Sequence, residues 1–336
     1  MKLPPGKIPI EILEEIVFKN LGVKREEVIL GPSAGADGAV IDVGNKSLVV
    51  SMDPITGALE RIGWLAVNIN ANDIATFGVQ PAFILSCIML PENANRKDVE
   101  TISAQMNTAA KNLGVAIVGG HCETTPQLTQ PIVVGCTLGL TEKGNYVTAR
   151  GAKPGDKLIL TKSAGIEGTA ILASDREEEL KTVMDSQTLR NSKNYYDQIS
   201  VVKDAITAFK TGGVNAMHDP TEGGVMGGIY EIASASNIGI KIFEEKIPVM
   251  PETEKICSFY KIDPLQLISS GALLISATSR CTEKIVRSLE KERIPASIIG
   301  EFLKEPQNRK IIRNNREIQT LPEPSSDHLW LALLRK

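Results

Sequence analysis

The chain has few aromatic residues and little excess charge. Aromatic residues make up 4% of its 336 residues, and 37 basic against 40 acidic side chains leave a formal net charge of -3. The sequence pI is about 5.8, and no basic run is interleaved with aromatics, so a nucleic acid partner is not expected. No apolar run approaches the roughly 18 residues of a membrane span, and the N-terminus lacks a signal-length apolar core. We therefore expect a cytoplasmic protein with no membrane partner.

Cysteine is scarce as well. The five cysteines are Cys87, Cys122, Cys136, Cys257 and Cys281. They stand far apart and form no C-x-x-C pair, which argues against zinc or redox chemistry and predicts reduced thiols. Gly119-Gly120 predict a loop that carries His121 and Cys122. A nucleophile and base pair at these two residues is conceivable, but adjacent residues of an extended chain point to opposite faces.

Several nucleotide and hydrolase motifs are missing. The chain has no G-x-x-x-x-G-K-[ST] phosphate loop and no strand-bound G-x-G-x-x-G. Ser269-Ser270-Gly271 is not the G-x-S-x-G elbow of a serine hydrolase. A P-loop enzyme, a dinucleotide-binding protein and a serine hydrolase are therefore not supported.

Hydrophobic periodicity predicts two mixed α/β units, residues 1–150 and 151–336, joined by a polar connection at 141–156. In the first unit the pattern predicts helices at 10–20, 60–77 and 99–113, a hairpin at 39–52, strands at 115–118 and 132–140, and a strand at 82–90 that is buried on both faces. In the second unit it predicts strands at 157–161, 238–243, 272–277 and 297–302, helices at 199–209 and 225–236, and a late hairpin around 314–315.

Asp73 is the most unusual residue of this pattern. Apolar residues recur at helical spacing through Leu65 and Ile69, and continuing the stripe by four residues places Asp73 where core is expected. An unpaired ionised carboxylate there would cost roughly several kcal/mol, so it requires a cation, hydrogen-bond donors or a cleft. Asn72 adds a second polar group. A carboxylate that caps a neighbouring loop is the alternative.

Other acidic residues share a setting of strand ends and glycines. Asp37 lies in a loop of small residues, Asp53 ends a strand, Glu123 follows Gly119-Gly120, and Asp219 precedes Gly223-Gly224. Glycines let backbone amides approach phosphate oxygens, and carboxylates without thiols suit a hard cation such as Mg2+. Together they predict a Mg-nucleotide site, although aspartate beside glycine is also common turn chemistry.

A series of motifs in one order carries a family resemblance. In order they are Gly35-Ala-Asp-Gly-Ala-Val-Ile41, Ser51-Met-Asp53, Asn72-Asp-Ile-Ala-Thr-Phe-Gly78-x-x-Pro81, Gly119-Gly-His-x-Glu-Thr124, Lys153-Pro-Gly-Asp-Lys-Leu-Ile-Leu-Thr161, His218-Asp-Pro-Thr-Glu-Gly-Gly224 and Ser270-Gly-Ala-Leu-Leu274. This series, which covers nearly the whole chain, resembles the aminoimidazole ribonucleotide (AIR) synthetase superfamily. The opening Pro5-Gly-Lys-Ile-Pro9 resembles its HypE branch, a hydrogenase maturation branch.

The resemblance implies a two-domain AIR-synthetase-like fold, in which the N-terminal sheets of two protomers pair into a barrel and the C-terminal domain is an α/β sandwich. It implies a homodimer with ATP at the interface and an enzyme that activates an amide-type or small-molecule acceptor by phosphoryl transfer. By motif match, the implied magnesium ligands are Asp37, Asp53 and Asp73, the implied catalytic residues are Asp73, Glu123 and Asp219, and the implied nucleotide-binding residues are Gly35, Asp37, Asn72, Gly119, Gly120, Thr124, Thr221 and Gly223.

Two departures separate the chain from the HypE pattern. HypE-like chains are expected to end in a cysteine that carries a carbamoyl group, whereas the last cysteine here is Cys281 and the sequence ends Leu-Leu-Arg-Lys336. They are also expected to carry Asn-Glu-Gly where this chain has Ser269-Ser270-Gly271, so a carboxylate near ATP is missing. We expect no carbamoyl adduct on the chain itself. Alternatives are a thiamine-monophosphate-kinase-like phosphotransferase and a non-catalytic nucleotide-binding dimer with a maturation-pathway protein partner.

Overall fold

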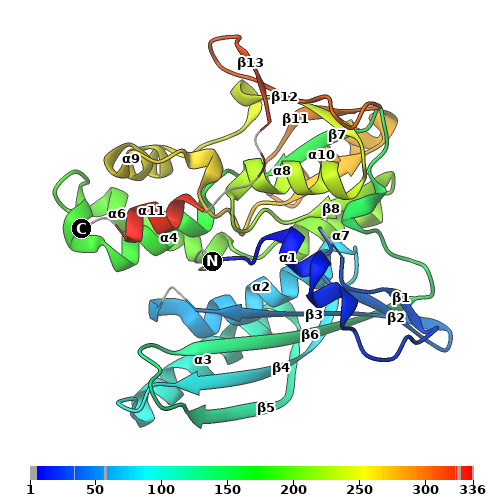
Figure 1. Cartoon of the computed structure of the whole chain (residues 1–336). Coiled ribbons are helices and arrows are strands. Elements are labelled where there is room, and N and C mark those ends of the chain that lie inside the picture. The colour runs from blue at the N-terminus through cyan, green and yellow to red at the C-terminus, as the bar shows by residue number, and fades with distance from the viewer. Residues whose placement is uncertain (1–5, 34, 57–58, 322, 324–326, 335–336) are drawn as a thin grey trace.

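Two β-sheets with their helices make up the chain, one above the other in Figure 1. The computed structural model describes residues 6–33, 35–56, 59–321, 323 and 327–334. The first sheet has the order β1-β2-β3-β6-β4-β5 and the second the order β13-β12-β9-β11-β7-β10-β8. This arrangement confirms the predicted mixed α/β, two-domain fold. Among the described residues, no helix is both long and apolar enough to cross a membrane.

The first sheet contains β1 (Val28–Leu30), β2 (Ala39–Val43), β3 (Lys46–Ile55), β4 (Pro81–Leu90), β5 (Ala116–Thr124) and β6 (Ile132–Glu142). Its helices are α1 (Ile10–Glu15), α2 (Ile62–Thr76) and α3 (Arg96–Leu113), and short 3-10 turns η1 (Val17–Lys19) and η2 (Leu59–Arg61) follow α1 and precede α2. The hairpin of β2 and β3 is confirmed, with Gly44 at φ +67 in its turn. The predicted helix at 10–20 is wrong in length because it ends at Glu15.

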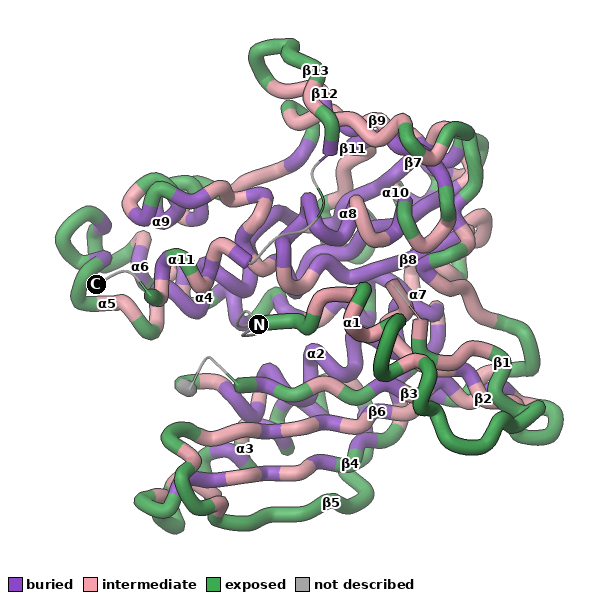
Figure 2. Tube along the Cα trace, in the orientation of Figure 1, coloured by how far each residue is buried: buried purple, intermediate pink, exposed green. Residues whose placement is uncertain are grey.

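Helices α2 and α3 cover one face of this sheet and leave the other open to solvent (Figure 2). The prediction that β4 is buried on both faces is therefore wrong. Its side chains alternate, and Phe83 and Leu85 on the open face are 40% and 39% exposed. Met52 on β3 and Leu140 on β6 are exposed beside them. The open face is thus an apolar surface.

Strand β5 is longer than the sequence predicts. The prediction of a strand at 115–118 followed by a glycine loop is wrong, because β4 and β5 stay paired as far as Leu90 and Thr124. Gly120 allows this pairing, since a Cβ there would lie 1.9 Å from the Ser86 carbonyl oxygen. The strand forms the exposed outer edge of the sheet.

Helix α2 is buried on every side, since all of its residues except Trp64 are buried. It packs against β3 and β6 on one side and against α7 (Val202–Thr211) of the second half on the other. Burial therefore extends beyond the predicted apolar stripe to the whole helix. The burial of Asp73, which is 4% exposed, is confirmed.

The second sheet contains β7 (Lys157–Thr161), β8 (Val214–His218), β9 (Gly239–Phe243), β10 (Leu274–Ala277), β11 (Ala296–Leu303), β12 (Arg309–Ile312) and β13 (Ile318–Thr320). Besides α7, its helices are α4 (Ile166–Asp175), α5 (Glu177–Leu180), α6 (Ser186–Lys193), α8 (Gly224–Ala235), α9 (Pro251–Tyr260), α10 (Ser279–Lys291) and α11 (His328–Leu333). The predicted strands, the late hairpin and α8 are confirmed. Strand β8 and helices α4, α9 and α11 were not predicted.

Buried polar contacts join the two halves. The Asn72 amide on α2 donates to the Ile199 carbonyl at 2.8 Å and accepts from the Val201 amide at 2.8 Å. The Trp64 indole donates to the Tyr196 carbonyl at 2.8 Å. Because Asn72 is fully buried, breaking this bidentate contact would leave unpaired groups in the core. The contact therefore fixes α2, with Asp73, against the second half.

Candidate functional site

The loop before β2 brings Asp37 to the second half of the molecule. Gly35 in this loop has φ +69, and a Cβ there would lie 2.9 Å from the Ala235 Cβ at the end of α8. Glycine therefore permits both the left-handed backbone and the close approach. The Asp37 side chain then reaches the end of β8, where His218 and Asp219 lie.

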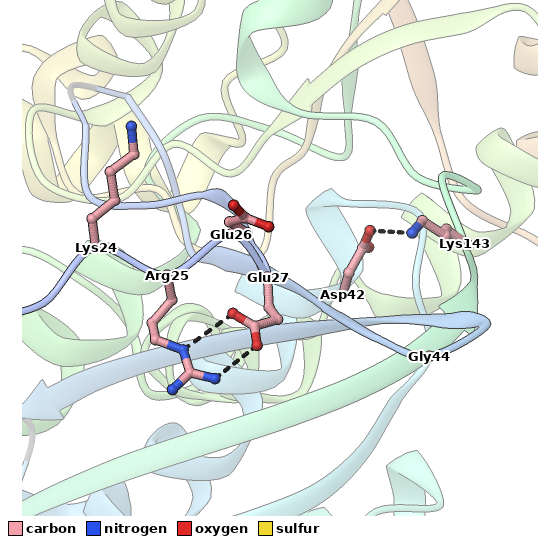
Figure 3. Close-up of a pocket in the computed structure, with 7 residues that line it drawn as sticks. All are labelled: Lys24, Arg25, Glu26, Glu27, Asp42, Gly44 and Lys143. Atoms are coloured by element: carbon pink, nitrogen blue, oxygen red, sulfur yellow. Dashed lines mark hydrogen bonds and ion pairs between the residues drawn. The ribbon is translucent and has the colours of Figure 1, made fainter.

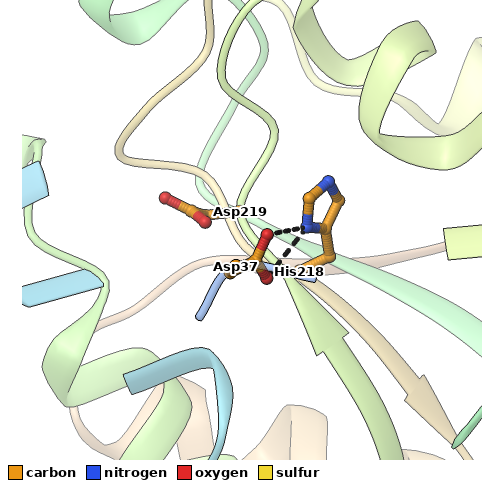
Figure 4. Close-up of side chains that lie close together, drawn as sticks. All are labelled: Asp37, His218 and Asp219. Carbon is orange, nitrogen blue, oxygen red and sulfur yellow. Dashed lines mark hydrogen bonds and ion pairs between the residues drawn. The ribbon is translucent and has the colours of Figure 1, made fainter. Parts of the chain in front are cut away.

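Asp37, His218 and Asp219 form a compact group whose ligand-type atoms all lie within 4.8 Å of one another. Figure 4 shows the Asp37 carboxylate between the His218 ring and the Asp219 carboxylate. His218 Nδ1 lies 2.8 Å from Asp37 Oδ1, and its Nε2 lies 2.8 Å from Glu231 Oε2 on α8. Among the described residues, this is the group of three that could hold a metal ion.

His218 serves this group as a cation. Burial works to lower its pKa, but Asp37 and Glu231 outweigh burial and raise the pKa well above its usual value. An imidazolium donates from both nitrogens, so His218 is not free to ligate a metal through either of them while both contacts hold. It instead orients Asp37 and offsets part of its charge.

Asp73 and Asp53 lie on the first-half side of the same group. The Ser51 hydroxyl is 2.7 Å from Asp73 Oδ2 and 2.6 Å from the Asp37 carbonyl oxygen, and its single proton serves one acceptor at a time. Asn70 on α2 fixes the Asp53 backbone, accepting from its amide at 2.8 Å and donating to its carbonyl at 3.1 Å. We call Asp37, Asp53, Asp73 and Asp219 the carboxylate cluster.

Crowding and burial shift the protonation of this cluster. Burial raises the pKa of Asp73 well above its usual value, with Asp53, Asp219 and Asp37 adding to the rise. Burial also raises the pKa of Asp219 to about 7; Asp37 adds to the rise and His218 opposes it. Asp53 is raised as well, first by burial. Such a cluster favours a bound cation, because a cation stabilises the charged carboxylates.

Lys7 is a positive side chain of the N-terminal segment that approaches the cluster. Its backbone amide donates to Glu222 Oε2 at 2.9 Å and its Nζ donates to Thr221 Oγ1 at 3.1 Å. Burial of the ammonium lowers its pKa, but Glu231, Asp37, Asp53 and Glu222 outweigh burial and raise it above the usual value. Lys7 therefore balances part of the negative charge.

The cluster fits magnesium by the chemistry of its donors. Carboxylate oxygens are the ligands that Mg2+ takes from proteins, usually one or two of them beside phosphate oxygens and water. Asp219 Oδ2 is buried and has no hydrogen-bond partner, so one ligand oxygen is available. The proposed magnesium ligands Asp37, Asp53 and Asp73 all lie in or beside this group.

The remaining predicted site residues divide into two sets. Thr221 and Gly223 lie beside the cluster, where Thr221 contacts Lys7 and the Gly223 amide donates to Asp327 Oδ2 at 2.7 Å. Asn72 is next to Asp73 but uses its amide to join the two halves. Their roles in nucleotide binding stay predictions.

The second set, Gly119, Gly120, Glu123 and Thr124, lies on the edge strand β5. In the sheet order β5 is three strands from β3, roughly 14 Å at the usual strand spacing. Glu123 is exposed and contacts His121 Nε2 at 3.0 Å. Within one chain, these residues therefore do not join the carboxylate cluster.

Sequence reasoning did not single out Lys7, Ser51, His218 or Glu231 as site residues. His218 stands within the His218-to-Gly224 motif and Ser51 within Ser51-Met-Asp53, so the motifs contained a signal for both. Lys7 and Glu231 reach the site through contacts between residues far apart in the chain. Lys7 stands within the opening stretch Pro5-Gly-Lys-Ile-Pro9, whereas Glu231 lies in none of the motifs.

A separate surface hollow lies beside the first sheet, with a volume of about 590 Å3 (Figure 3). Arg25 pairs with Glu27 at 2.7 Å, and Lys143 pairs with Asp42 at 2.7 Å across its walls. The charges of these four lining residues are satisfied within the protein. No residue that lines the hollow belongs to the carboxylate cluster, and we assign the hollow no ligand.

Fold and site together define a class of two-domain α/β proteins with a buried carboxylate cluster where the two halves meet. Models of the AIR synthase related protein family match the chain, the N-terminal domain at residues 35–141 and the C-terminal domain at 153–312. The chain belongs to the AIR synthase related family.

Within the family the chain is similar to hydrogenase maturation proteins. It is 30% identical over 307 residues to a putative hydrogenase expression/formation protein of Methanocaldococcus jannaschii, covering 89% of each chain. It is 29% identical to the carbamoyl dehydratase HypE of Rhizobium leguminosarum, over 80% of this chain and 77% of the relative. The expectation of a HypE-like enzyme agrees with these names.

Solved structures agree in fold. A hydrogenase maturation protein HypE in complex with ATP superposes with a TM-score of 0.75 at 21% identity, covering 97% of this chain and 98% of that chain. A thiamine-monophosphate-kinase-type protein complexed with AMPPCP and TMP superposes with a TM-score of 0.73 at 18% identity, covering 95% and 98%. At these identities the likeness concerns the fold.

Proposed function

We propose that the chain is an ATP- and Mg2+-dependent enzyme that activates the oxygen of an amide-type acceptor by phosphoryl transfer. The observation that carries the proposal is the buried carboxylate cluster, with Asp37 and Asp219 within 4.8 Å and an Asp219 oxygen without a partner. Relatives named carbamoyl dehydratase support an acceptor with a carbamoyl group, and a structural neighbour bound to ATP supports the nucleotide.

The chemistry proposed is a dehydration driven by ATP. The acceptor oxygen takes the γ-phosphoryl group, and ADP leaves. The C–O bond then breaks, the oxygen departs with phosphate, and both N–H protons are lost, one to the phosphate and one to solvent, which leaves a nitrile. Mg2+ would neutralise phosphate charge at Asp37, Asp53 and Asp73. No protein nucleophile is required, because positioning and charge neutralisation carry such reactions.

We also propose a homodimer formed through the open face of the first sheet. Met52, Phe83, Leu85 and Leu140 expose apolar side chains there, and a surface of this kind favours a protein partner. Glu123 pairs in register with Met89 of β4 on this same face. A second copy facing it would cover Glu123 at the interface between the two chains.

A maturation-pathway protein is the further partner we propose, since one structural neighbour is a HypE-HypF complex. We place the enzyme in the cytoplasm. The five cysteines form no disulfide among the described residues, which is compatible with a reducing compartment.

ADP release tests the function. Protein, Mg2+ and ATP would be incubated with compounds that carry a carbamoyl group, with thiamine monophosphate, or with no acceptor. We expect ADP only with Mg2+ and a carbamoyl acceptor. ADP formed with thiamine monophosphate would instead support the phosphotransferase, and bound ATP without turnover under any condition would support a nucleotide-binding dimer.

A further inference from the structure

A second set of buried polar groups lies beside Asp219. Glu167 Oε2, Ser270 Oγ and Asp219 Oδ2 each lack a hydrogen-bond partner, and the three residues are 4%, 0% and 1% exposed. The other buried side-chain atoms without a partner, among the residues that the structure describes, are hydroxyls. Buried carboxylate oxygens are normally hydrogen-bonded, and the described residues leave one oxygen of Glu167 and one of Asp219 open to a ligand.

Strand pairing brings these residues together at one end of three neighbouring strands of the second sheet. Leu274 at the start of β10 pairs with Leu160 near the end of β7 and with His218 at the end of β8. Asp219 directly follows β8, Ser270 precedes β10, and Glu167 lies in the first turn of α4 after β7. The ends that carry the three side chains therefore meet.

Hydrogen bonds hold the start of α4 against the segment that carries Ser270. The Gly165 amide donates to Ser269 Oγ at 2.8 Å, and the Gly168 amide donates to the Ile268 carbonyl at 3.1 Å. A Cβ at Gly168 would lie 2.4 Å from Leu267 side-chain atoms, so only glycine permits this approach. The surroundings of Glu167 are thus fixed by packing.

The charges around Glu167 are negative. Burial raises the pKa of Glu167 to about 7; the nearby Ser270 hydroxyl opposes the rise, and the carboxylates of Asp327, Asp219 and Glu222 add to it. No basic side chain opposes this rise in the pKa of Glu167. Glu167 is therefore within electrostatic reach of Asp219 in the carboxylate cluster, and no cation of the described residues offsets its charge.

A shared metal ion does not account for Glu167. The group of described residues with metal-binding spacing comprises Asp37, His218 and Asp219 and leaves Glu167 outside. A carboxylate and a hydroxyl outside metal distance bind hydrogen-bond donors instead. An amide group presents two such donors on the nitrogen beside the oxygen that phosphoryl transfer would activate.

We propose that Glu167, with Ser270 beside it, binds the NH2 group of the amide-type acceptor and makes the site specific for it. The inference rests on the proposed function, because the acceptor oxygen must face the ATP phosphates near Asp219 while its nitrogen faces Glu167. It also accounts for the absence of the glutamate expected at position 270, since Glu167 on α4 supplies a carboxylate beside Ser270.

Two cysteine derivatives that differ only in this group test the proposal. N-acetyl-S-carbamoylcysteine amide ends in C(=O)NH2, and N-acetyl-S-acetylcysteine amide ends in C(=O)CH3 of similar shape. Calorimetric titration into the full chain saturated with Mg-ADP should give at least about tenfold tighter binding of the carbamoyl compound.

Variants then assign the preference to Glu167. Glu167→Met has a similar length and no acceptor, and should bind both compounds equally; Glu167→Gln keeps one neutral acceptor and should retain only part of the preference. Glu254→Gln, at an exposed position of α9, should behave as the unmodified chain. Unchanged Mg-ADP affinity verifies the fold of each variant.

The outcomes separate the two proposals. A chain that does not bind Mg-ATP contradicts the proposed function. A chain that binds Mg-ATP but binds both cysteine derivatives equally, or neither, overturns the role of Glu167. A tenfold preference that survives in Glu167→Met overturns it too.

Discussion

Glu167→Gln should make the stability of the metal-free protein less dependent on pH. Burial raises the pKa of Glu167 from 4.5 to about 7, so the folded state holds the proton more tightly than the unfolded chain. The contribution of Glu167 to stability is therefore full below about pH 4.5 and is lost as pH rises toward about 7. Glutamine resembles the protonated carboxyl and does not titrate.

The magnitude follows from the shift. One pKa unit corresponds to about 1.4 kcal/mol, so the unmodified chain should lose on the order of 2 to 3 kcal/mol of stability through Glu167 between pH 5 and pH 8. The advantage of Glu167→Gln over the unmodified chain in free energy of unfolding should grow by about that amount over the same range. The gain of Glu167→Gln in free energy of unfolding is thus largest at pH 8.

Urea denaturation at several pH values, in buffer with a chelator, measures this difference. The chelator matters because a bound cation would itself shift the carboxylates. Glu254→Gln, an exposed change on α9, is the matched control and should run parallel to the unmodified chain. A difference between Glu167→Gln and the unmodified chain that does not vary with pH would refute the reasoning.

Three further predictions concern the cluster and the assembly. Asp73→Asn should keep the fold and weaken Mg-ATP binding at least about tenfold, about 1.4 kcal/mol; unchanged affinity in calorimetry at fixed Mg2+ would contradict the ligand role. Lys7→Met removes an ammonium near four carboxylates and should tighten Mg2+ binding to the nucleotide-free protein severalfold, whereas equal or weaker binding would count against it. Light scattering at micromolar concentration should give about twice the 36.3 kDa chain mass, and a monomer would remove the dimer from the account.

Local sequence signals predicted much of the fold. The hairpin of β2 and β3 was predictable because its turn residues Gly44 and Asn45 are adjacent to the strands that they connect. Helix α3 ends at Gly114 with φ +70, as its sequence indicates. Asp73 was predictable as a buried carboxylate, although the helix that carries it is buried on all sides.

Other features depend on contacts that no local pattern encodes. The glycines at 119 and 120 predicted a loop, but Gly120 is required where β5 approaches the Ser86 carbonyl. The contact between Lys7 and Thr221 spans 214 positions, and Glu167 is placed by the packing of α4 against residues 267–269. These residues became candidates only when their surroundings were known.

Oxygen tracing tests most directly the claim that the enzyme activates an amide oxygen with ATP. The protein would be incubated with Mg2+, unlabelled ATP and N-acetyl-S-carbamoylcysteine amide labelled with 18O in its carbamoyl group, and the released phosphate analysed by mass spectrometry. Our account predicts one 18O atom in each phosphate formed with ADP. ADP release accompanied by phosphate that carries no 18O would contradict it.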